Sequence, residues 1–370
     1  MSAIATQLDA AWVAEPVLAH ASAGGADPDA GGVVLGSFGS TVHAELDGFV
    51  VVIQPEAAPR LPNGIGVPRH SLNGILGPRE RVSAGAGTRP RFSSGKTSGW
   101  VQAGDATTLR SGRLQAGELE IVWETQRPPA WSAAVQSWPV EELASVVGRA
   151  RAILAATGRS GPMANRTVGA GAGAPPDSSE LRAETRTELD PPHSHREPVE
   201  VLAAVDGFTQ GDTDATFGLE CLLLAAQEMD PQAASEAAGL LVGRGSGLTP
   251  VGDDILAAAA LTLSCLGCAS GRPTEQVSAT VAALLPAGIH LRTTPISATL
   301  LELACRGEAI GPARALLDSR PMAPQALAAA VRRLSALGHS TGAAYVNTIG
   351  ALMAALAACA PSHPEKELVR

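Results

Sequence analysis

Hydrophobic and polar positions follow two patterns along the chain, and the first is typical of strands. Between residue 31 and about residue 126, short apolar runs are separated by clusters of Gly, Pro, Ser and Asn. The runs read GGVVLGSFGSTVHAEL, GFVVVIQ, VQAG and GELEIVWETQ. We therefore expect a mostly β N-terminal domain, either a barrel or a curled sheet. Helical periodicity at residues 2–22 and 140–157 predicts helices on both sides of it.

The second pattern is helical, and it continues from residue 199 to the end of the chain. The pair Asp230-Pro231 predicts a helix start, because Asp is a preferred N-cap and Pro is tolerated at the first helical position. That helix is expected to run to Val242, where Gly243 stands in the place of a C-terminal cap. Thr249-Pro250 predicts the start of the next helix. The predicted fold class is α+β, with a β-rich N-terminal domain and an all-helical C-terminal domain.

A segment between these two parts, residues 158–198, has almost no apolar periodicity. We predict that it is a disordered linker or insertion. The predicted domains are therefore 1–157, with its flanking helices, and 199–370. His193 and His195 lie in the segment, and we interpret them as solvated side chains and not as metal ligands.

Composition excludes several classes of partner. The formal net charge is −9, whereas a protein that binds nucleic acid needs a basic face. No stretch approaches the ~20 uncharged apolar residues of a membrane-spanning helix. The N-terminus has no basic flank before an apolar run, so no signal peptide is expected. We expect a cytoplasmic protein without a nucleic-acid or membrane partner.

The five cysteines, an odd number in apolar helical contexts, are typical of reduced thiols. Cys265 and Cys268 form a lone C-x-x-C without a second pair or a His pair at metal spacing, so buried small side chains are favoured over a zinc or redox site.

The stretch GRGSGLTPVGDD, residues 243–254, carries most of the candidate chemistry. It is not a dinucleotide fingerprint, since its glycines have the spacing G-x-G-x-G and a helix precedes them. It is not a Walker A loop either, because no Lys follows Gly247. Elsewhere Gly95-Lys96-Thr97 lacks the required upstream glycine, since Pro90 occupies that position.

This loop nevertheless suits a small anion. Its glycines allow positive φ angles and let a ligand approach the backbone. A helix start at Thr249 would aim unsatisfied N–H groups at the same space, and Arg244 would add a guanidinium group. The alternative is a tight turn between helices in which the aspartates only complement the helix dipole. That alternative leaves the alternating glycines and Gly252 unexplained.

Two further helix starts follow at a regular spacing. Thr294-Pro295 repeats the Thr-Pro opening, and Gly338 precedes Ser340 and Thr341 as N-cap candidates. Thr249, Thr294 and Ser340 are 45 and 46 residues apart, about one helical hairpin each. If the hairpins pack side by side, three positive helix ends with hydroxyl groups face one pocket. Ordinary caps in a helical repeat would produce the same spacing.

The adjacent aspartates Asp253 and Asp254 admit two interpretations. They could hold Mg²⁺ against a phosphate, or one could orient an amide or ammonium group or act as a general base. Their side chains would lie about 100° apart on a helix, so one is expected to be the working residue and the other a supporting one. His339 is a further acid–base candidate, with a cap or surface role as the alternative.

The stretch GRGSGLTPVGDDIL resembles the signature G-x-G-x-G-L-T-P-x-G-D-D of a bacterial family long described only as a domain of unknown function. A member of that family is similar to a subunit of oxamate carbamoyltransferase, encoded with genes for anaerobic allantoin degradation. TTPISATLLELACRGE and GHSTG resemble later segments of the family, and GSTVHAEL and PNGIGV resemble its start. The resemblance covers most of the chain apart from residues 158–198.

The resemblance implies transfer of a carbamoyl group between phosphate and the nitrogen of oxamate, in a complex with other subunits. It assigns the small anionic substrate, carbamoyl phosphate or a relative, to the loop and the helix starts. Asp253 or Asp254 would serve the amine side or a metal. The candidate substrate-binding residues are Arg244, Gly245, Ser246, Gly247, Thr249, Thr293, Thr294, Ser340 and Thr341.

This chain departs from the family pattern after Ser-Thr-Gly, where an acidic residue is expected and Ala343 and Ala344 stand instead. The departure implies a different substrate or reliance on partner subunits. Two other functions stay open: a non-catalytic scaffold or regulatory subunit that binds a small anion, and a stand-alone Mg²⁺-dependent phosphoryl-transfer enzyme.

Overall fold

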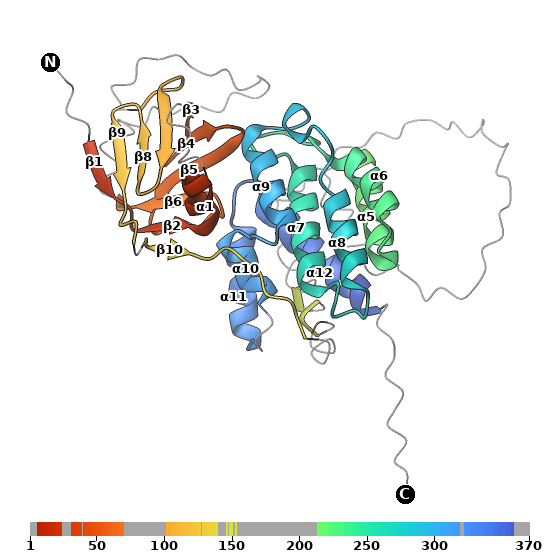
Figure 1. The fold of residues 1–370 in the computed structure, drawn as a ribbon. Coiled ribbons are helices and arrows are strands. Elements are labelled where there is room, and N and C mark those ends of the chain that lie inside the picture. The colour runs from red at the N-terminus through yellow and green to blue at the C-terminus, as the bar shows by residue number, and fades with distance from the viewer. Residues whose placement is uncertain are drawn as a thin grey trace, which may run out of the picture.

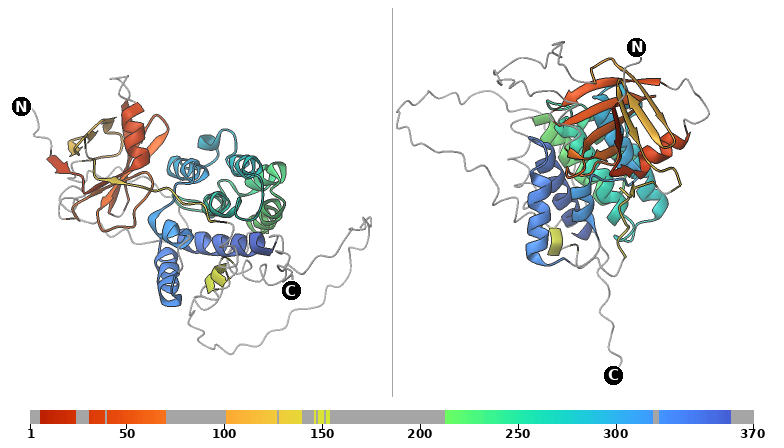
Figure 2. Two further views of the ribbon diagram at one scale, coloured as in Figure 1. Left: turned by 60° about the horizontal axis from the view of Figure 1, so that its bottom comes forward. Right: turned by 90° about the vertical axis from the view of Figure 1, so that its left-hand side faces the viewer.

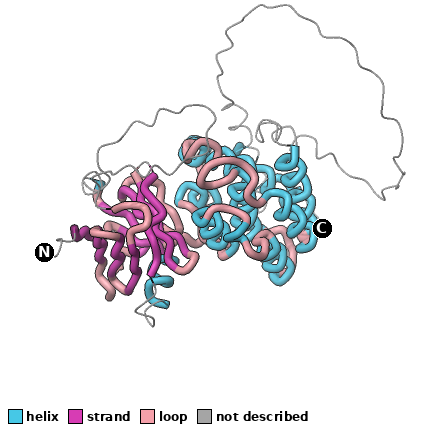
Figure 3. Tube along the Cα trace, turned by 90° about the horizontal axis from the view of Figure 1, so that it is seen from above, coloured by secondary structure: helices cyan, strands magenta, loops and turns pink. Residues whose placement is uncertain are grey.

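A computed structural model shows strands gathered in the N-terminal part of the chain and helices in the C-terminal part (Figures 1 and 3). This segregation confirms the α+β prediction. The structure describes residues 6–23, 31–38, 40–69, 101–126, 128–139, 146, 148–150, 152–153, 213–318 and 322–358. The segment 158–198 with His193 and His195, the stretch around Pro90 and Gly95-Lys96-Thr97, and Cys359 lie outside these residues, and the domain boundaries at 157 and 198 stay predictions.

The N-terminal part is a single curled sheet of ten strands (Figure 2). The pairing is mostly antiparallel, and β1–β9, β5–β6 and β2–β10 are parallel pairs. Helix α1 (Glu15–Ala23) packs beside this sheet. The spatial order is β1 (Thr6–Asp9), β9 (Leu119–Val122), β8 (Arg113–Ala116), β7 (Ala106–Arg110), β3 (Gly31–Phe38), β4 (Thr41–Leu46), β5 (Phe49–Pro55), β6 (Gly64–Val67), β2 (Trp12–Ala14) and β10 (Ala130–Trp131).

Local sequence explains the central hairpin of the sheet. Strand β5 is buried at every position, as its apolar run FVVVI predicts, and Gln54 after this run is buried as well. The turn between β4 and β5 is Asp47-Gly48, and both residues have positive φ angles of 49° and 80°. Two such residues form the tight turn whose twist matches that of the strands.

Two sequence predictions are wrong in this part. Residues 2–22 were expected to be one helix, but they contain β1 and β2 before α1 begins at Glu15. Pairing with β9 and β6, which are distant in sequence, overrides the local helical pattern. The run VQAG at 101–104 forms a loop and turn, and the strand β7 begins after it. In the predicted helix 140–157, the described residues are helical.

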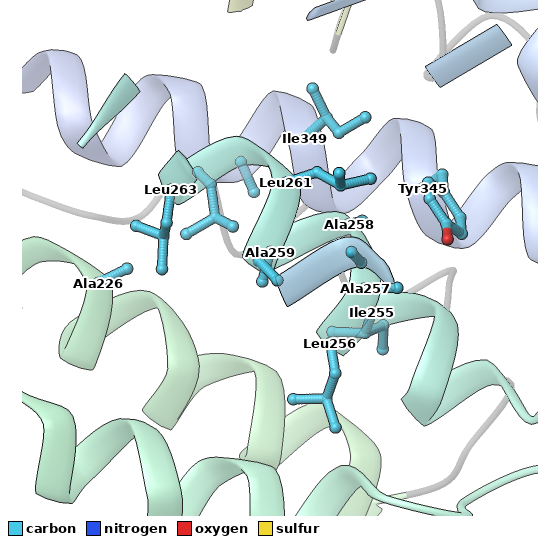
Figure 4. Close-up of a cluster of buried hydrophobic side chains, with 14 of the residues drawn as sticks. Ala226, Ile255, Leu256, Ala257, Ala258, Ala259, Leu261, Leu263, Tyr345 and Ile349 are labelled. Carbon is cyan, nitrogen blue, oxygen red and sulfur yellow. The ribbon is translucent and has the colours of Figure 1, made fainter. Parts of the chain in front are cut away.

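The C-terminal part is a bundle around one central helix, α7 (Val251–Leu266). Nearly every residue of α7 is buried, which is the pattern of a core helix surrounded on all sides. Figure 4 shows Ile255, Leu261 and their neighbours between α5 and α12. The surrounding elements are α5 (Thr213–Glu228), α6 (Pro231–Leu241), α8 (Thr274–Ala283), the short 3₁₀ helix η3 (Ile289–Leu291), α9 (Pro295–Cys305), α10 (Gly311–Leu317), α11 (Pro324–Ser335) and α12 (Thr341–Ala358).

Helix α12 is the one described helix that is long and apolar enough to cross a membrane, and 67% of its apolar window is buried. This degree of burial is expected of a helix in a protein core. The described residues therefore carry no clear membrane-protein signal. The four described cysteines, Cys221, Cys265, Cys268 and Cys305, are free thiols.

The sheet and the bundle are packed against each other through β5 and α9. Val50 and Val52 of β5 form an apolar cluster with Ile296 of α9. The backbone N–H of Val50 donates a hydrogen bond to Thr299 Oγ1 at 3.0 Å. The sheet therefore fixes α9 from one side, and α9 carries Thr294 at its start.

Two glycines of the bundle make a matched pair for testing how closely α6 and α7 approach. A Cβ at Gly252, in the first turn of α7, would lie 1.9 Å from the Leu241 carbonyl oxygen at the end of α6. A Cβ at Gly239, exposed on α6, would meet nothing within 4 Å. We predict that Gly252→Ala lowers the free energy of unfolding by at least ~2 kcal/mol through overpacking. Gly239→Ala should instead raise it by up to ~1 kcal/mol, because Ala is the better helix former.

Urea unfolding of the two variants measures both effects. Equal stability of Gly252→Ala and the unchanged protein would contradict the close contact between the two helices.

Candidate functional site

The candidate site is built where the loop from 243 to 250 joins α6 to α7. Gly243 ends α6 with a φ angle of 71°, so the C-terminal cap predicted there is confirmed. A Cβ on Gly243 would lie 2.3 Å from the carbonyl oxygen of Arg292, which shows how closely the chain before α9 passes the loop. Gly245 and Gly247 also have positive φ angles, and both are exposed together with Ser246.

The structure confirms the helix N-caps predicted at Asp230 and Thr294, but not the one predicted at Thr249. Asp230 caps α6 by accepting hydrogen bonds from the N–H groups of Gln232 and Ala233, and Thr294 caps α9 by accepting one from Ser297. Thr249 is not the N-cap of α7, because that position belongs to Pro250, one residue later. The Thr249 hydroxyl contacts another helix instead, since its Oγ1 lies 2.9 Å from Thr341 Oγ1 at the start of α12.

These contacts bring the starts of α7, α9 and α12 together. Thr294 Oγ1 donates a hydrogen bond to the carbonyl oxygen of Leu248, in the loop before α7. Gly342 allows α12 to approach α11, because a Cβ there would lie 2.0 Å from the Leu334 carbonyl oxygen. We name the resulting group the aspartate–hydroxyl cluster; it consists of Asp253, Asp254, Thr249, Thr293, Thr294, Ser297 and Thr341.

Asp253 is the buried centre of this cluster, with 2% of its surface exposed. Its Oδ1 accepts a hydrogen bond from the Gly243 N–H at 2.7 Å. Its Oδ2 accepts from Ser297 Oγ at 2.8 Å and from Thr293 Oγ1. The side chain therefore ties the end of α6 and the start of α9 to α7. Each of the three hydrogen bonds contributes to holding these segments together.

Asp254 is equally buried, at 3% exposed, but it is bonded differently. Its Oδ2 has no hydrogen-bond partner. Burial raises the pKa of Asp254 to about 8, and the nearby charge of Asp253 raises it as well. Hydrogen bonds of Thr341 and Thr249 act in the opposite direction. At neutral pH the Asp254 carboxyl group is therefore mostly in its neutral form.

Tyr345, on α12, lies near Asp254 of the cluster. Its side chain lies one turn into the helix and is 3% exposed. Burial raises the pKa of Tyr345, and the proximity of Asp254 raises it further, so the phenol stays neutral.

The other candidate residues lie at the rim of the cluster or outside it. Arg244 is exposed, and its Nε donates a hydrogen bond to the Leu240 carbonyl oxygen at 3.3 Å. Ser340 accepts a backbone hydrogen bond from Ala344 at the start of α12, and His339 is exposed before it. Within the described residues, no group of three His, Cys, Asp or Glu side chains is arranged to hold a metal.

Sequence reasoning missed Ser297, Tyr345 and the backbone N–H of Gly243. Ser297 had a detectable signal, since it is a polar residue in an apolar helix three positions after an N-cap threonine. Gly243 N–H had none, because its partner depends on the path of the loop.

Replacing Asp253 or Asp254 by asparagine should change the free energy of unfolding in opposite directions. Asp254 has a higher pKa in the folded protein, about 8, than the value of 3.8 of an exposed Asp. Between about pH 4 and pH 8 the folded protein keeps a proton that the unfolded chain has lost. The free energy of unfolding therefore falls as pH rises through this window, by at most about 1.4 kcal/mol per pH unit. Asp254→Asn should remove this slope and raise the stability at pH 7.5.

Asp253→Asn should lower the stability by ~2–4 kcal/mol, because an amide accepts the three hydrogen bonds less well and turns an NH₂ group toward donors. Thermal unfolding of both variants between pH 4.5 and pH 8.5 tests the pair. The assignment is wrong if Asp254→Asn follows the pH dependence of the unchanged protein, or if Asp253→Asn is as stable as that protein.

Comparison with known families places this cluster inside a recognised region. Residues 241–354 match the model of the family described as oxamate carbamoyltransferase subunit AllH. The match covers less than a third of the chain, but it extends from the last residue of α6 into α12 and so includes the whole cluster. No curated protein and no solved structure matches the chain. The match confirms that this part of the chain is similar to a subunit of oxamate carbamoyltransferase.

Proposed function

We propose that the protein is a subunit of a carbamoyltransferase of the oxamate carbamoyltransferase type, and that the aspartate–hydroxyl cluster binds its small anionic substrate. The observation that carries this proposal is the convergence of three helix starts on one glycine-rich loop, joined by Thr249, Thr294 and Thr341. The family match over the same residues supports it.

Carbamoyl phosphate has the chemistry that this arrangement suits. Helix N-termini and exposed backbone N–H groups favour anions, and Gly245 and Gly247 leave the loop backbone accessible. Carbamoyl transfer passes through a tetrahedral intermediate with a negatively charged oxygen, which fixed N–H and hydroxyl donors stabilise. We propose the exchange of carbamoyl phosphate and oxamate with oxalurate and phosphate, in the nitrogen catabolism of allantoin.

The proposal includes other subunits, because the matched family is described as a subunit. Asp253 and Asp254 have different parts in it. Both oxygens of Asp253 already accept hydrogen bonds, so we assign this residue to holding the loop. The candidate for a role toward the substrate is Asp254, together with the hydroxyl groups of Thr249 and Thr341.

Ligand-dependent thermal unfolding tests the substrate class. A ligand at 100 times its Kd stabilises the native state by ~2.7 kcal/mol, a readily measured shift in Tm. We predict such a shift with carbamoyl phosphate, and a smaller one with phosphate or oxamate alone. Thr249→Val should abolish the shift, because it removes a hydroxyl group without changing the side-chain shape.

Thr274→Val is the matched control, since Thr274 is an exposed residue at the start of α8. That variant should keep the full shift. The proposed anion site is wrong if none of the three ligands shifts Tm, or if both variants lose the shift equally. Stabilisation that requires Mg²⁺ would favour a phosphoryl-transfer enzyme instead.

A further inference from the structure

Asp254 has an orphaned oxygen inside the aspartate–hydroxyl cluster. Oδ2 is buried and has no hydrogen-bond partner. Thr341 and Thr249 nevertheless lie close enough to this carboxyl group to influence its pKa through hydrogen bonding.

A buried oxygen without a partner fits a neutral acid better than a carboxylate. In a carboxylate, Oδ2 would carry half of a negative charge with no donor nearby, which is costly in a buried position. In the neutral acid, Oδ2 can be an uncharged carbonyl oxygen, and the hydrogen on the other oxygen can be donated to a threonine hydroxyl. The adjacent Asp253, by contrast, accepts three hydrogen bonds.

The protonation of Asp254 decides where the threonine hydrogens point. Thr249 Oγ1 and Thr341 Oγ1 are 2.9 Å apart, so one of them donates to the other. If Asp254 donates into this pair, the remaining hydroxyl hydrogen is free to point away from the carboxyl group. If Asp254 is ionised, it draws a hydroxyl hydrogen toward itself. Both threonines are half-buried, and Thr249 follows directly after the exposed residues of the glycine-rich loop.

We infer that Asp254 is a positioning residue, which in its neutral form aims the Thr249–Thr341 hydroxyl pair at the bound substrate as a hydrogen-bond donor. The site then takes a small oxyanion, such as a phosphate or carboxylate group, and not an amine or a metal cation. This inference rests on the proposed function, since it concerns the same anion site. It gives Asp254 a positioning role in place of the other roles considered for the aspartates, which were Mg²⁺ binding, orientation of an amide or ammonium group, and general-base catalysis.

The groups around Asp254 also favour its neutral form. The groups that face it are Asp253 on its own helix, Tyr345 on α12 and the two threonine hydroxyls. No cation among them would favour ionisation. The raised pKa, about 8, keeps the carboxyl group neutral at pH 7. Uptake of an anion adds negative charge and strengthens the preference for the neutral form.

Sulfate is the probe for the experiment, because it stays fully ionised between pH 6 and pH 10 and cannot bring a proton itself. Its affinity for the full chain is measured by titration calorimetry across that range. For the unchanged protein we expect constant affinity at low pH and a decline above about pH 8, approaching tenfold per pH unit. Asp254→Asn should bind sulfate with similar affinity at pH 7 but without the decline, because the amide always donates.

Asp230→Asn is the matched control, since it removes one acidic group at the far end of α6, where the amide can still cap the helix. That variant should keep the decline above pH 8. Oxamate, titrated in parallel, tells whether a carboxylate binds in the same way as a tetrahedral oxyanion.

Three results would overturn the inference. A flat pH profile in the unchanged protein contradicts it, and this measurement does not depend on whether the Asn variant folds. So does Asp254→Asn binding sulfate tenfold or more tightly than the unchanged protein at pH 7, because Asp254 would then be an ionised, repelling group. If neither sulfate, oxamate nor carbamoyl phosphate binds at any pH, the proposed function fails together with the inference. Binding with a flat profile leaves the proposed function standing.

Discussion

The three hydrogen bonds to the Asp253 carboxylate are the interaction on which the candidate site depends. One donor comes from the end of α6, and the other two come from Thr293 and Ser297 at the start of α9. A buried acidic group needs hydrogen-bond partners, and displacing the end of α6 would remove the donor to Oδ1, whereas displacing the start of α9 would remove both donors to Oδ2. Its place in the first turn of α7 helps, because the helix dipole favours negative charge there. The hydrogen bonds of Asp253 therefore hold the glycine-rich loop and the ends of α6, α7 and α9 together.

Close backbone approach is the second constraint, and it links the site to the whole fold. Gly252 lets α7 touch the end of α6, and Gly342 lets α12 touch α11. Helix α9 is fixed from its other side, where Thr299 accepts a hydrogen bond from strand β5. The sheet thus contributes to the geometry of a site to which it supplies no side chain among the described residues. A loop alone, without these contacts, would not keep three helix starts together.

Local chemistry made much of this predictable from the sequence. The β and helical halves, the caps at Asp230 and Thr294 and the C-terminal glycine Gly243 all follow from short-range rules. Where pairing across long sequence distances decides, prediction failed: residues 2–22 form two strands before α1 because β9 and β6 lie beside them. The spacing of the helix starts indicated their convergence, but not that Thr249 would bond Thr341. The different surroundings of Asp253 and Asp254 could not be predicted from the sequence either. The two residues are identical and adjacent, so only the tertiary contacts around each one distinguish them.

The open sheet ends in a very short strand at one of its edges. Strand β10 contributes two residues and β1 contributes four. Sheet edges normally offer rows of free N–H and C=O groups to which another chain can add a strand, and short edges restrict such additions. A second polypeptide that extended this sheet would gain few backbone hydrogen bonds. Extension of the sheet by another chain is therefore disfavoured at the edge formed by β10.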